Sequence, residues 1–149
     1  MKLPLYFWFI LVLLAGALLP IQAGWNTKLA KVIESSVYAS LISFAVGTLT
    51  LIIYVLITRQ HVSFESLKSV PVYAWLGGVL GAFYVTIIVL AFPKIGPALT
   101  FGLIIAGQLL IAVVLEHFNI LVAQQHSINI WRILGILLIM GGVVLIRKF

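Results

Sequence analysis

The sequence has no cysteine and very little acid. Its 149 residues include only three acidic side chains, Glu34, Glu65 and Glu116, and 8% of the residues are charged. The absence of cysteine excludes disulfides, thiolate nucleophiles and cysteine-based metal sites. The scarcity of charge excludes a water-soluble domain of this length, because such a domain needs far more charged residues to cover its surface.

The few ionisable residues are too scattered to form a catalytic or metal site. His61, His117 and His126 do not have the spacing of metal ligands. The sequence also holds no Ser-His-Asp arrangement, phosphate-cradling loop or acid pair. We therefore predict that the protein is not an enzyme and that it uses no metal and no cofactor.

The net charge of +6 does not indicate nucleic-acid binding. Lysine and arginine cluster at the ends of apolar runs, where they anchor helices against anionic lipid headgroups. No basic patch lies beside aromatic residues that could stack on bases. The expected partner of this surface is the lipid bilayer.

Long apolar runs dominate the sequence instead. Hydrophobic residues make up 64% of the chain and the mean hydropathy is +1.27. A run of about 20 residues crosses the hydrocarbon as a helix, and a backbone in lipid must satisfy its own hydrogen bonds. The sequence therefore predicts an all-α, multi-pass protein whose single membrane domain covers residues 1–149. Its five predicted transmembrane helices cover residues 3–23, 37–58, 73–92, 98–118 and 130–146.

The first run could also be taken for a signal peptide. Its apolar stretch is longer than the roughly 7–15 residues of a signal-peptide core, so we interpret it as a membrane span.

Glycine and proline mark candidate packing and hinge positions. Prolines in the segment 93–97, Pro93-Lys94-Ile95-Gly96-Pro97, predict a tight turn that no helix can run through. Small residues let helices pack closely in lipid; the alternative is that these glycines let helices slide during a transport cycle. The hinge or packing candidates are Gly77, Gly78, Gly81, Pro93, Gly96 and Pro97.

The distribution of lysine and arginine barely predicts how the chain is oriented in the membrane. Five crossings place Lys2, Arg59, Lys68 and Arg132 on one side of the membrane, and Lys28, Lys31, Lys94, Arg147 and Lys148 on the other. Orientation normally follows a clear excess of lysine and arginine on the cytoplasmic side. A chain that inserts both ways round can pair with itself, reproducing the inverted symmetry that many transporters build within one longer chain. We therefore predict a dual-topology antiparallel dimer.

A small set of polar residues inside the runs forms the candidate substrate site. Gln108 lies near the middle of its run, where it could bind a substrate or hydrogen-bond a neighbouring helix. Gln22 and Asn26 share a helix face at the end of the first run, where they could bind a polar ligand or cap the run at the interface. Trp25 and Tyr84 complete the candidate set.

Glu116 is the best placed of the acids for ion coupling. It follows Gln108 by two turns on roughly the same face, and His117 is adjacent. A carboxylate of this kind could exchange a proton for a substrate. The alternative is a surface residue at a helix end.

Several segments together resemble a known family. They are Pro20-Ile21-Gln22-Ala23-Gly24-Trp25-Asn26, Trp75-Leu76-Gly77-Gly78-Val79-Leu80-Gly81-Ala82-Phe83, Pro93-Lys94-Ile95-Gly96-Pro97-Ala98, Gly107-Gln108-Leu109 and Glu116-His117-Phe118. In order and spacing they are similar to the small five-helix YdcZ-like family of bacterial proteins within the drug/metabolite transporter superfamily. The similarity covers nearly the whole chain.

This resemblance implies an inner-membrane protein that acts as a homodimer or with an oppositely oriented paralogue. Relatives in the superfamily export small molecules, so we predict an exporter subunit that works by alternating access on an unidentified small-molecule substrate. The alternative is a non-transporting membrane interaction or assembly protein. The chain departs from these relatives at two points. Glu116-His117-Phe118-Asn119 stands where the family usually has Asp-His-Phe-Gly, so Asn119 replaces the glycine. The first run has no acidic residue, whereas the smallest multidrug exporters of the superfamily carry one in their first helix.

Overall fold

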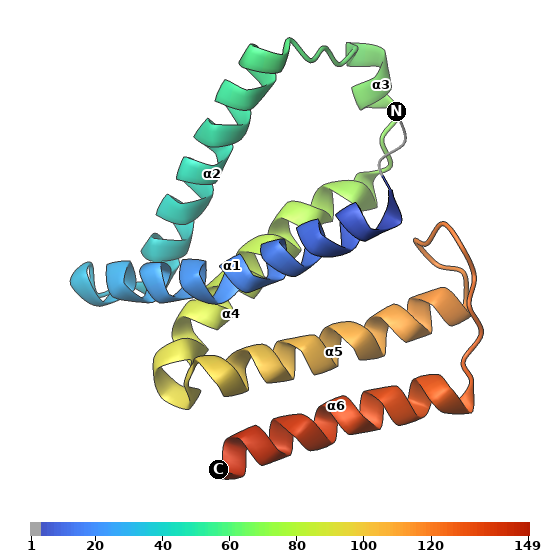
Figure 1. The fold of residues 1–149 in the computed structure, drawn as a ribbon. Coiled ribbons are helices and arrows are strands. Elements are labelled where there is room, and N and C mark those ends of the chain that lie inside the picture. Colours follow the sequence, from blue (N-terminus) through green and yellow to red (C-terminus); the bar gives the residue numbers. More distant parts are fainter. Residues whose placement is uncertain (1–3) are drawn as a thin grey trace. The chain divides into compact units, whose positions relative to one another are not determined.

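The computed structural model describes residues 4–149, which contain helices and no strand. The predicted start at residue 3 and the charge of Lys2 lie outside the described residues. The elements, in chain order, are α1 (Leu5–Val32), α2 (Ser36–Thr58), α3 (Phe64–Lys68), the 3-10 helix η1 (Val72–Trp75), α4 (Leu76–Ile95), α5 (Pro97–His117) and α6 (Ile130–Lys148) (Figure 1). The prediction of five long apolar helices is confirmed, since five helices of the described chain are long and apolar enough to cross a membrane.

Short polar side chains fix where several helices begin. Ser35 accepts a hydrogen bond from the Tyr38 amide at the start of α2, and Asn129 accepts one from the Arg132 amide at the start of α6. Each bond satisfies one of the backbone amides that a helix leaves unpaired in its first turn.

Three helices are followed by a non-glycine residue in the left-handed conformation. Glu34, Arg59 and Asn119 have φ of 55°, 51° and 55° after α1, α2 and α5. In each case the following amide reaches back to a carbonyl of the last helical turn, as Ile120 does to Leu115 at 2.9 Å. Glycine favours this conformation and asparagine tolerates it best among the other residues. This explains how Asn119 can occupy the left-handed position that follows α5.

Helix α1 ends at Val32, whereas the sequence predicted an end at residue 23. The predicted end was placed where the hydropathy falls, just before Asn26, Thr27 and Lys28. Hydropathy indicates which part of a helix contacts lipid, and it does not indicate where the helix ends. Those residues remain compatible with a helix, so the backbone continues through 28 residues. Gln22 and Asn26 therefore lie within α1 rather than at its end, and their role as caps of the apolar run at the interface stays a prediction.

The expectation that no helix can run through the segment 93–97 is also wrong in part. Helix α4 continues through Pro93 to Ile95. Proline removes one amide donor and one hydrogen bond of the helix, and α4 ends two residues after Pro93. The chain breaks instead at Gly96, whose φ of 79° and ψ of 161° are accessible essentially only to glycine. Pro97 then begins α5, since the first helical position needs no amide donor.

The described residues form two compact units, one reaching from the N-terminal side to Lys94 and the other covering Ile95–Phe149. We call them the N-terminal unit and the C-terminal unit. That both belong to one membrane domain stays a prediction.

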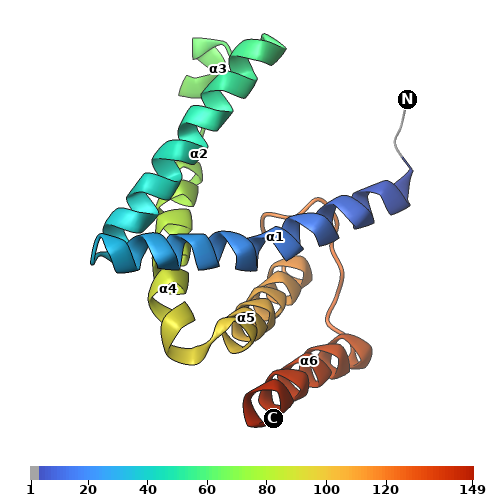
Figure 2. The same ribbon diagram turned by 60° about the vertical axis from the view of Figure 1, so that its left-hand side comes forward.

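In the N-terminal unit, α1 and α2 meet near their connecting turn and diverge from there, as both views show (Figures 1 and 2). Ala30 of α1, Ala39 of α2 and Val89 of α4 form the buried core where these helices meet. Two alanines at this crossing let the backbones approach, as small residues do in membrane helices.

In the C-terminal unit, α5 and α6 run side by side (Figures 1 and 2). Gly102 of α5 lies against Val143 of α6, which is 7% exposed. A Cβ atom at Gly102 would lie 2.9 Å from Val143 Cγ2, too close for two carbon atoms. This helix pair therefore depends on the missing side chain of Gly102.

The apolar side chains of the spans mostly point outward. Leu13, Leu56, Leu80 and Leu138 are between 67% and 76% exposed. A water-soluble protein does not expose apolar patches of this extent. Lipid acyl chains are the solvent that suits these surfaces.

Candidate substrate site

A hydrogen bond joins α1 to α2 inside the N-terminal unit. The Asn26 amide nitrogen donates to the Ser43 hydroxyl at 3.1 Å, and Asn26 is only 8% exposed. Asn26 was a candidate from the sequence, but nothing in the sequence indicated that it pairs with Ser43. The bond fixes the register of α1 against α2.

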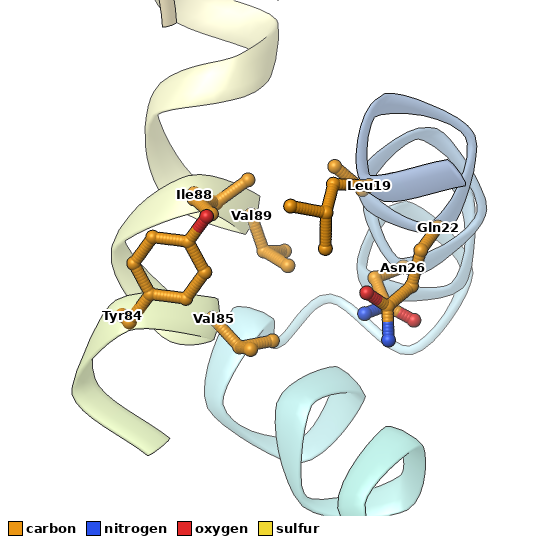
Figure 3. Close-up of a pocket in the computed structure, with 8 residues that line it drawn as sticks. Leu19, Gln22, Asn26, Tyr84, Val85, Ile88 and Val89 are labelled. Atoms are coloured by element: carbon orange, nitrogen blue, oxygen red, sulfur yellow. The ribbon is translucent and has the colours of Figure 1, made fainter. Parts of the chain in front are cut away.

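Asn26 belongs to a small pocket between α1 and α4 (Figure 3). Gln22 and Asn26 project into it from the same side of α1, and Tyr84 faces it from α4. The structure thus brings three predicted site residues together. The pocket volume is about 10 Å³, however, which is room for about one water molecule. The pocket is too small to hold a solute.

A larger hollow adjoins this pocket and shares Gln22 and Val85 with it. Its volume is about 240 Å³, slightly below the roughly 300–1,000 Å³ of pockets that hold drug-sized ligands. We call it the polar groove. Its lining residues are Gln22 of α1, Ser43, Phe44, Gly47, Thr48 and Leu51 of α2, and Val85 of α4.

The polar groove lies close to the middle of the helices that form it. At 1.5 Å per residue, Gln22 is roughly 5 Å from the midpoint of α1 and Thr48 is roughly 2 Å from the midpoint of α2. Gln22 lies near the middle of α1 because this helix continues to Val32; in a helix ending at residue 23, Gln22 would lie at the end. Substrate sites of secondary transporters tend to lie near the bilayer midplane.

Two other hollows are less suited to a polar solute. One, of about 280 Å³ in the C-terminal unit, is lined only by aliphatic residues such as Leu110 and Met140. The other, of about 310 Å³, lies by the turn between α1 and α2 and holds Lys31 and Glu34. It is at the end of the helices rather than within the span.

Two predicted substrate residues line neither the small pocket nor the polar groove. Trp25 is 69% exposed on α1 and lines neither the pocket nor the groove. Gln108 is exposed on α5 in the C-terminal unit, and among residues 4–149 its side chain makes no hydrogen bond. The roles of both residues in substrate binding stay predictions.

Glu116 and His117 organise the loop between α5 and α6. The Glu116 carboxylate pairs with the Arg132 guanidinium, and Arg132 also donates to the His126 carbonyl at 2.8 Å. His117 Nδ1 accepts a hydrogen bond from the Ile128 amide at 3.2 Å. These contacts support the interpretation of Glu116 as a residue at a helix end, where it and His117 stabilise the loop between α5 and α6. The coupling role stays a prediction.

The glycines of α4 differ in their surroundings. A Cβ atom at Gly81 would make an ordinary contact with Phe44 of α2, at 3.6 Å, whereas one at Gly77 or Gly78 would meet nothing within 4 Å. In this unit, then, Gly81 lies at a helix contact and the other two glycines do not.

Reasoning from the sequence missed three residues that matter here. Thr48 was not singled out, although it lies at the centre of an apolar run. Gly102 was overlooked, although Ala106 follows it at the spacing typical of close helix packing. Arg132 was counted only as a charge at the membrane rim, and its pairing with Glu116 had no signal in the sequence.

These features define a multi-pass α-helical membrane protein with a polar groove within its spans. The family model described as "Putative inner membrane exporter, YdcZ" matches residues 7–145, and the chain belongs to this family. The protein is therefore a multi-pass inner-membrane protein of an exporter family. Comparison with curated proteins and with solved structures gave no match.

The bond between Asn26 and Ser43 gives a first testable result. We expect Asn26→Leu to lower the free energy of unfolding by about 0.6 kcal/mol and at most about 1.7 kcal/mol, the range for hydrogen bonds between membrane helices. Thermal unfolding of the purified protein in detergent measures the change. Ser43→Ala should have the same effect, and the double variant should lose no more than either single one. Fully additive losses would show that the bond contributes nothing.

Proposed function

We propose that this protein exports a small molecule and that the substrate binds in the polar groove. The observation that carries the proposal is a hollow of about 240 Å³ near mid-span that presents a carboxamide and two hydroxyls. Polar groups are costly inside a membrane and commonly mark a substrate path. Membership of an exporter family supports export as the direction of transport.

In this proposal the chain is one half of an antiparallel dimer with alternating access. The second half is another copy or an oppositely oriented paralogue. The near-even distribution of lysine and arginine between the two sides supports insertion in both orientations. The helices of the partner would close the open side of the groove.

Filling the groove tests the binding site. Gly47 lines the groove, and a Cβ atom there meets nothing within 4 Å, so Gly47→Leu places its side chain in the hollow without disturbing α2. We expect export from proteoliposomes, measured with a panel of labelled metabolites, to fall about tenfold, because the leucine side chain occupies volume that the substrate needs; a tenfold fall corresponds to about 1.4 kcal/mol of lost binding.

The matched control is Gly16→Leu on α1. Its Cβ atom also meets nothing within 4 Å, and Gly16 lines neither the small pocket nor the polar groove. Equal export by the two variants would remove the groove from the transport path. Absence of export by the unmodified protein across the whole panel would contradict the proposed function.

Orientation tests the dimer separately. Because the chain has no cysteine, Ser127→Cys and Lys148→Cys each introduce a single label site, on opposite sides of a five-span chain. Near half-labelling of both sites in intact cells by an impermeant maleimide would support dual topology. All-or-none labelling, opposite at the two sites, would contradict a homodimer in both orientations.

A non-transporting interaction or assembly protein is the second candidate. The observation that favours it is the shortage of ionisable side chains at depth: within the five described spans Glu116 is the one acidic residue, and it is paired with Arg132. The two candidates differ in ligand binding. A solute that raises the melting temperature of the purified protein favours the transporter, since any ligand of the native state stabilises it.

A further inference from the structure

The polar groove combines hydrogen-bonding groups with a complete lack of charge, and this combination bears on what it can bind. We infer that the groove takes uncharged solutes carrying hydroxyl or amide groups, in preference to cations or anions. This inference rests on the proposed function and specifies the class of substrate.

The first observation concerns where the hydroxyl groups of the helices find their partners. The hydroxyls of Thr50, Thr58 and Thr100 donate to a carbonyl of their own helix, at 2.7–2.9 Å. Such bonds satisfy a hydroxyl without any ligand. The hydroxyl of Thr48, only two residues before Thr50, makes no hydrogen bond among residues 4–149, and Thr48 lines the groove.

The other two polar groups of the groove also retain hydrogen-bonding capacity. The Ser43 oxygen accepts from Asn26, so its own hydroxyl hydrogen is still available to donate. Gln22 is exposed on α1 and its carboxamide offers both donors and an acceptor. The groove can therefore donate and accept several hydrogen bonds, each of which a solute hydroxyl or amide could complete.

The second observation is the absence of any counter-charge. No lining residue of the groove is ionisable. None of the acidic and basic residues in the described part of the N-terminal unit lines the groove. Two of them, Lys31 and Glu34, line the separate hollow at the α1–α2 turn. A buried ion loses its hydration, and without a counter-charge no attraction compensates for that loss. A neutral solute avoids that loss and still satisfies the groove's polar groups.

The remaining lining adds an apolar requirement. Phe44, Leu51 and Val85 provide hydrophobic surface beside the polar groups. A volume of about 240 Å³ limits the occupant to a small metabolite. The inferred substrate thus has a polar edge, an apolar face and no net charge.

Solute counterflow in proteoliposomes of the full chain tests the inference. The probes are labelled thymidine and myo-inositol as uncharged solutes, choline and tetraphenylphosphonium as cations, and glutamate as an anion. Accumulation of an uncharged probe without the charged ones supports the inference. Accumulation of a charged probe instead overturns the inference and leaves the proposed function intact, whereas accumulation of none overturns both.

A charge placed in the groove gives a sharper result. Gln22→Glu keeps the side-chain shape and adds a negative charge. We expect counterflow of the uncharged probe to fall about tenfold and counterflow or binding of choline to appear. Gln60→Glu, at an exposed position after α2, makes the same change in net charge outside the groove and should alter neither.

A second variant covers the case in which Gln22→Glu fails to fold. Thr48→Val keeps the shape and removes the hydroxyl, and we expect KM for the uncharged probe to rise about three- to tenfold, the equivalent of one hydrogen bond. If wild-type protein prefers choline, or if Thr48→Val leaves KM unchanged, the inference is wrong.

Discussion

Replacing Gly102 by alanine is expected to separate α5 from α6. The new Cβ atom would lie 2.9 Å from Val143 Cγ2 and 3.3 Å from Cγ1. Valine in a helix is nearly restricted to one side-chain rotamer, so Val143 cannot turn away. We expect the free energy of unfolding to fall by about 1–3 kcal/mol, as overpacking does in other helical proteins, and thermal unfolding in detergent measures it.

The expected pattern of controls identifies the clash as the cause. Gly141→Ala on α6 meets no neighbour within 4 Å, so it should leave stability unchanged or raise it slightly through better helix propensity. Val143→Ala, added to Gly102→Ala, removes both clashing methyl groups and should restore much of the loss. Equal stability of the Gly102 and Gly141 variants would contradict the observed helix packing.

Removing the Arg132 guanidinium is expected to release the loop between α5 and α6. Arg132→Gln breaks the pair with Glu116 and the bond to the His126 carbonyl. The two side chains are 26% and 30% exposed, so solvent screens part of the attraction. We expect a loss of about 1–2 kcal/mol, at the lower end of hydrogen bonds to charged groups.

The measurements are thermal unfolding and limited proteolysis of the segment 118–129, which should be cleaved faster. Arg147→Gln near the end of α6 removes the same charge without breaking an ion pair of the described residues, and it should change neither readout. Glu116→Gln should reproduce the Arg132 effect, and the double variant should add little. Additive losses would mean that the two residues act independently.

The five spans follow from composition, but their contacts do not. Apolar runs locate helices because lipid demands both an apolar surface and internal hydrogen bonds. In lipid, however, nearly every face of a helix is apolar, so periodicity does not reveal which faces meet. The pairing of Asn26 with Ser43 and of Glu116 with Arg132 therefore became visible only in three dimensions.

The residues of the candidate site could likewise be predicted from the sequence only in part. Gln22, Asn26 and Tyr84 could be singled out because polar side chains are unusual in apolar runs. Thr48 could not, because a threonine in a helix is expected to bond its own backbone, and only the structure shows that Thr48 does not while Thr50 does. The depth of Gln22 also needed the structure, since it depends on how far α1 continues beyond the apolar residues.

The unequal lengths of the spans bring the bilayer itself into the energetics. Helix α1 has 28 residues and α6 has 19, or roughly 42 Å against 28 Å at 1.5 Å per residue. The hydrocarbon layer is about 30 Å thick, so α6 matches it while α1 must tilt or extend into the headgroups. A mismatch between the apolar length of a helix and the hydrocarbon thickness costs fractions of a kcal/mol per Å, and the apolar length of α1 ends where Asn26, Thr27 and Lys28 begin. Acyl-chain length should therefore shift the tilt of α1, and with it the opening of the groove that α1 shares with α2.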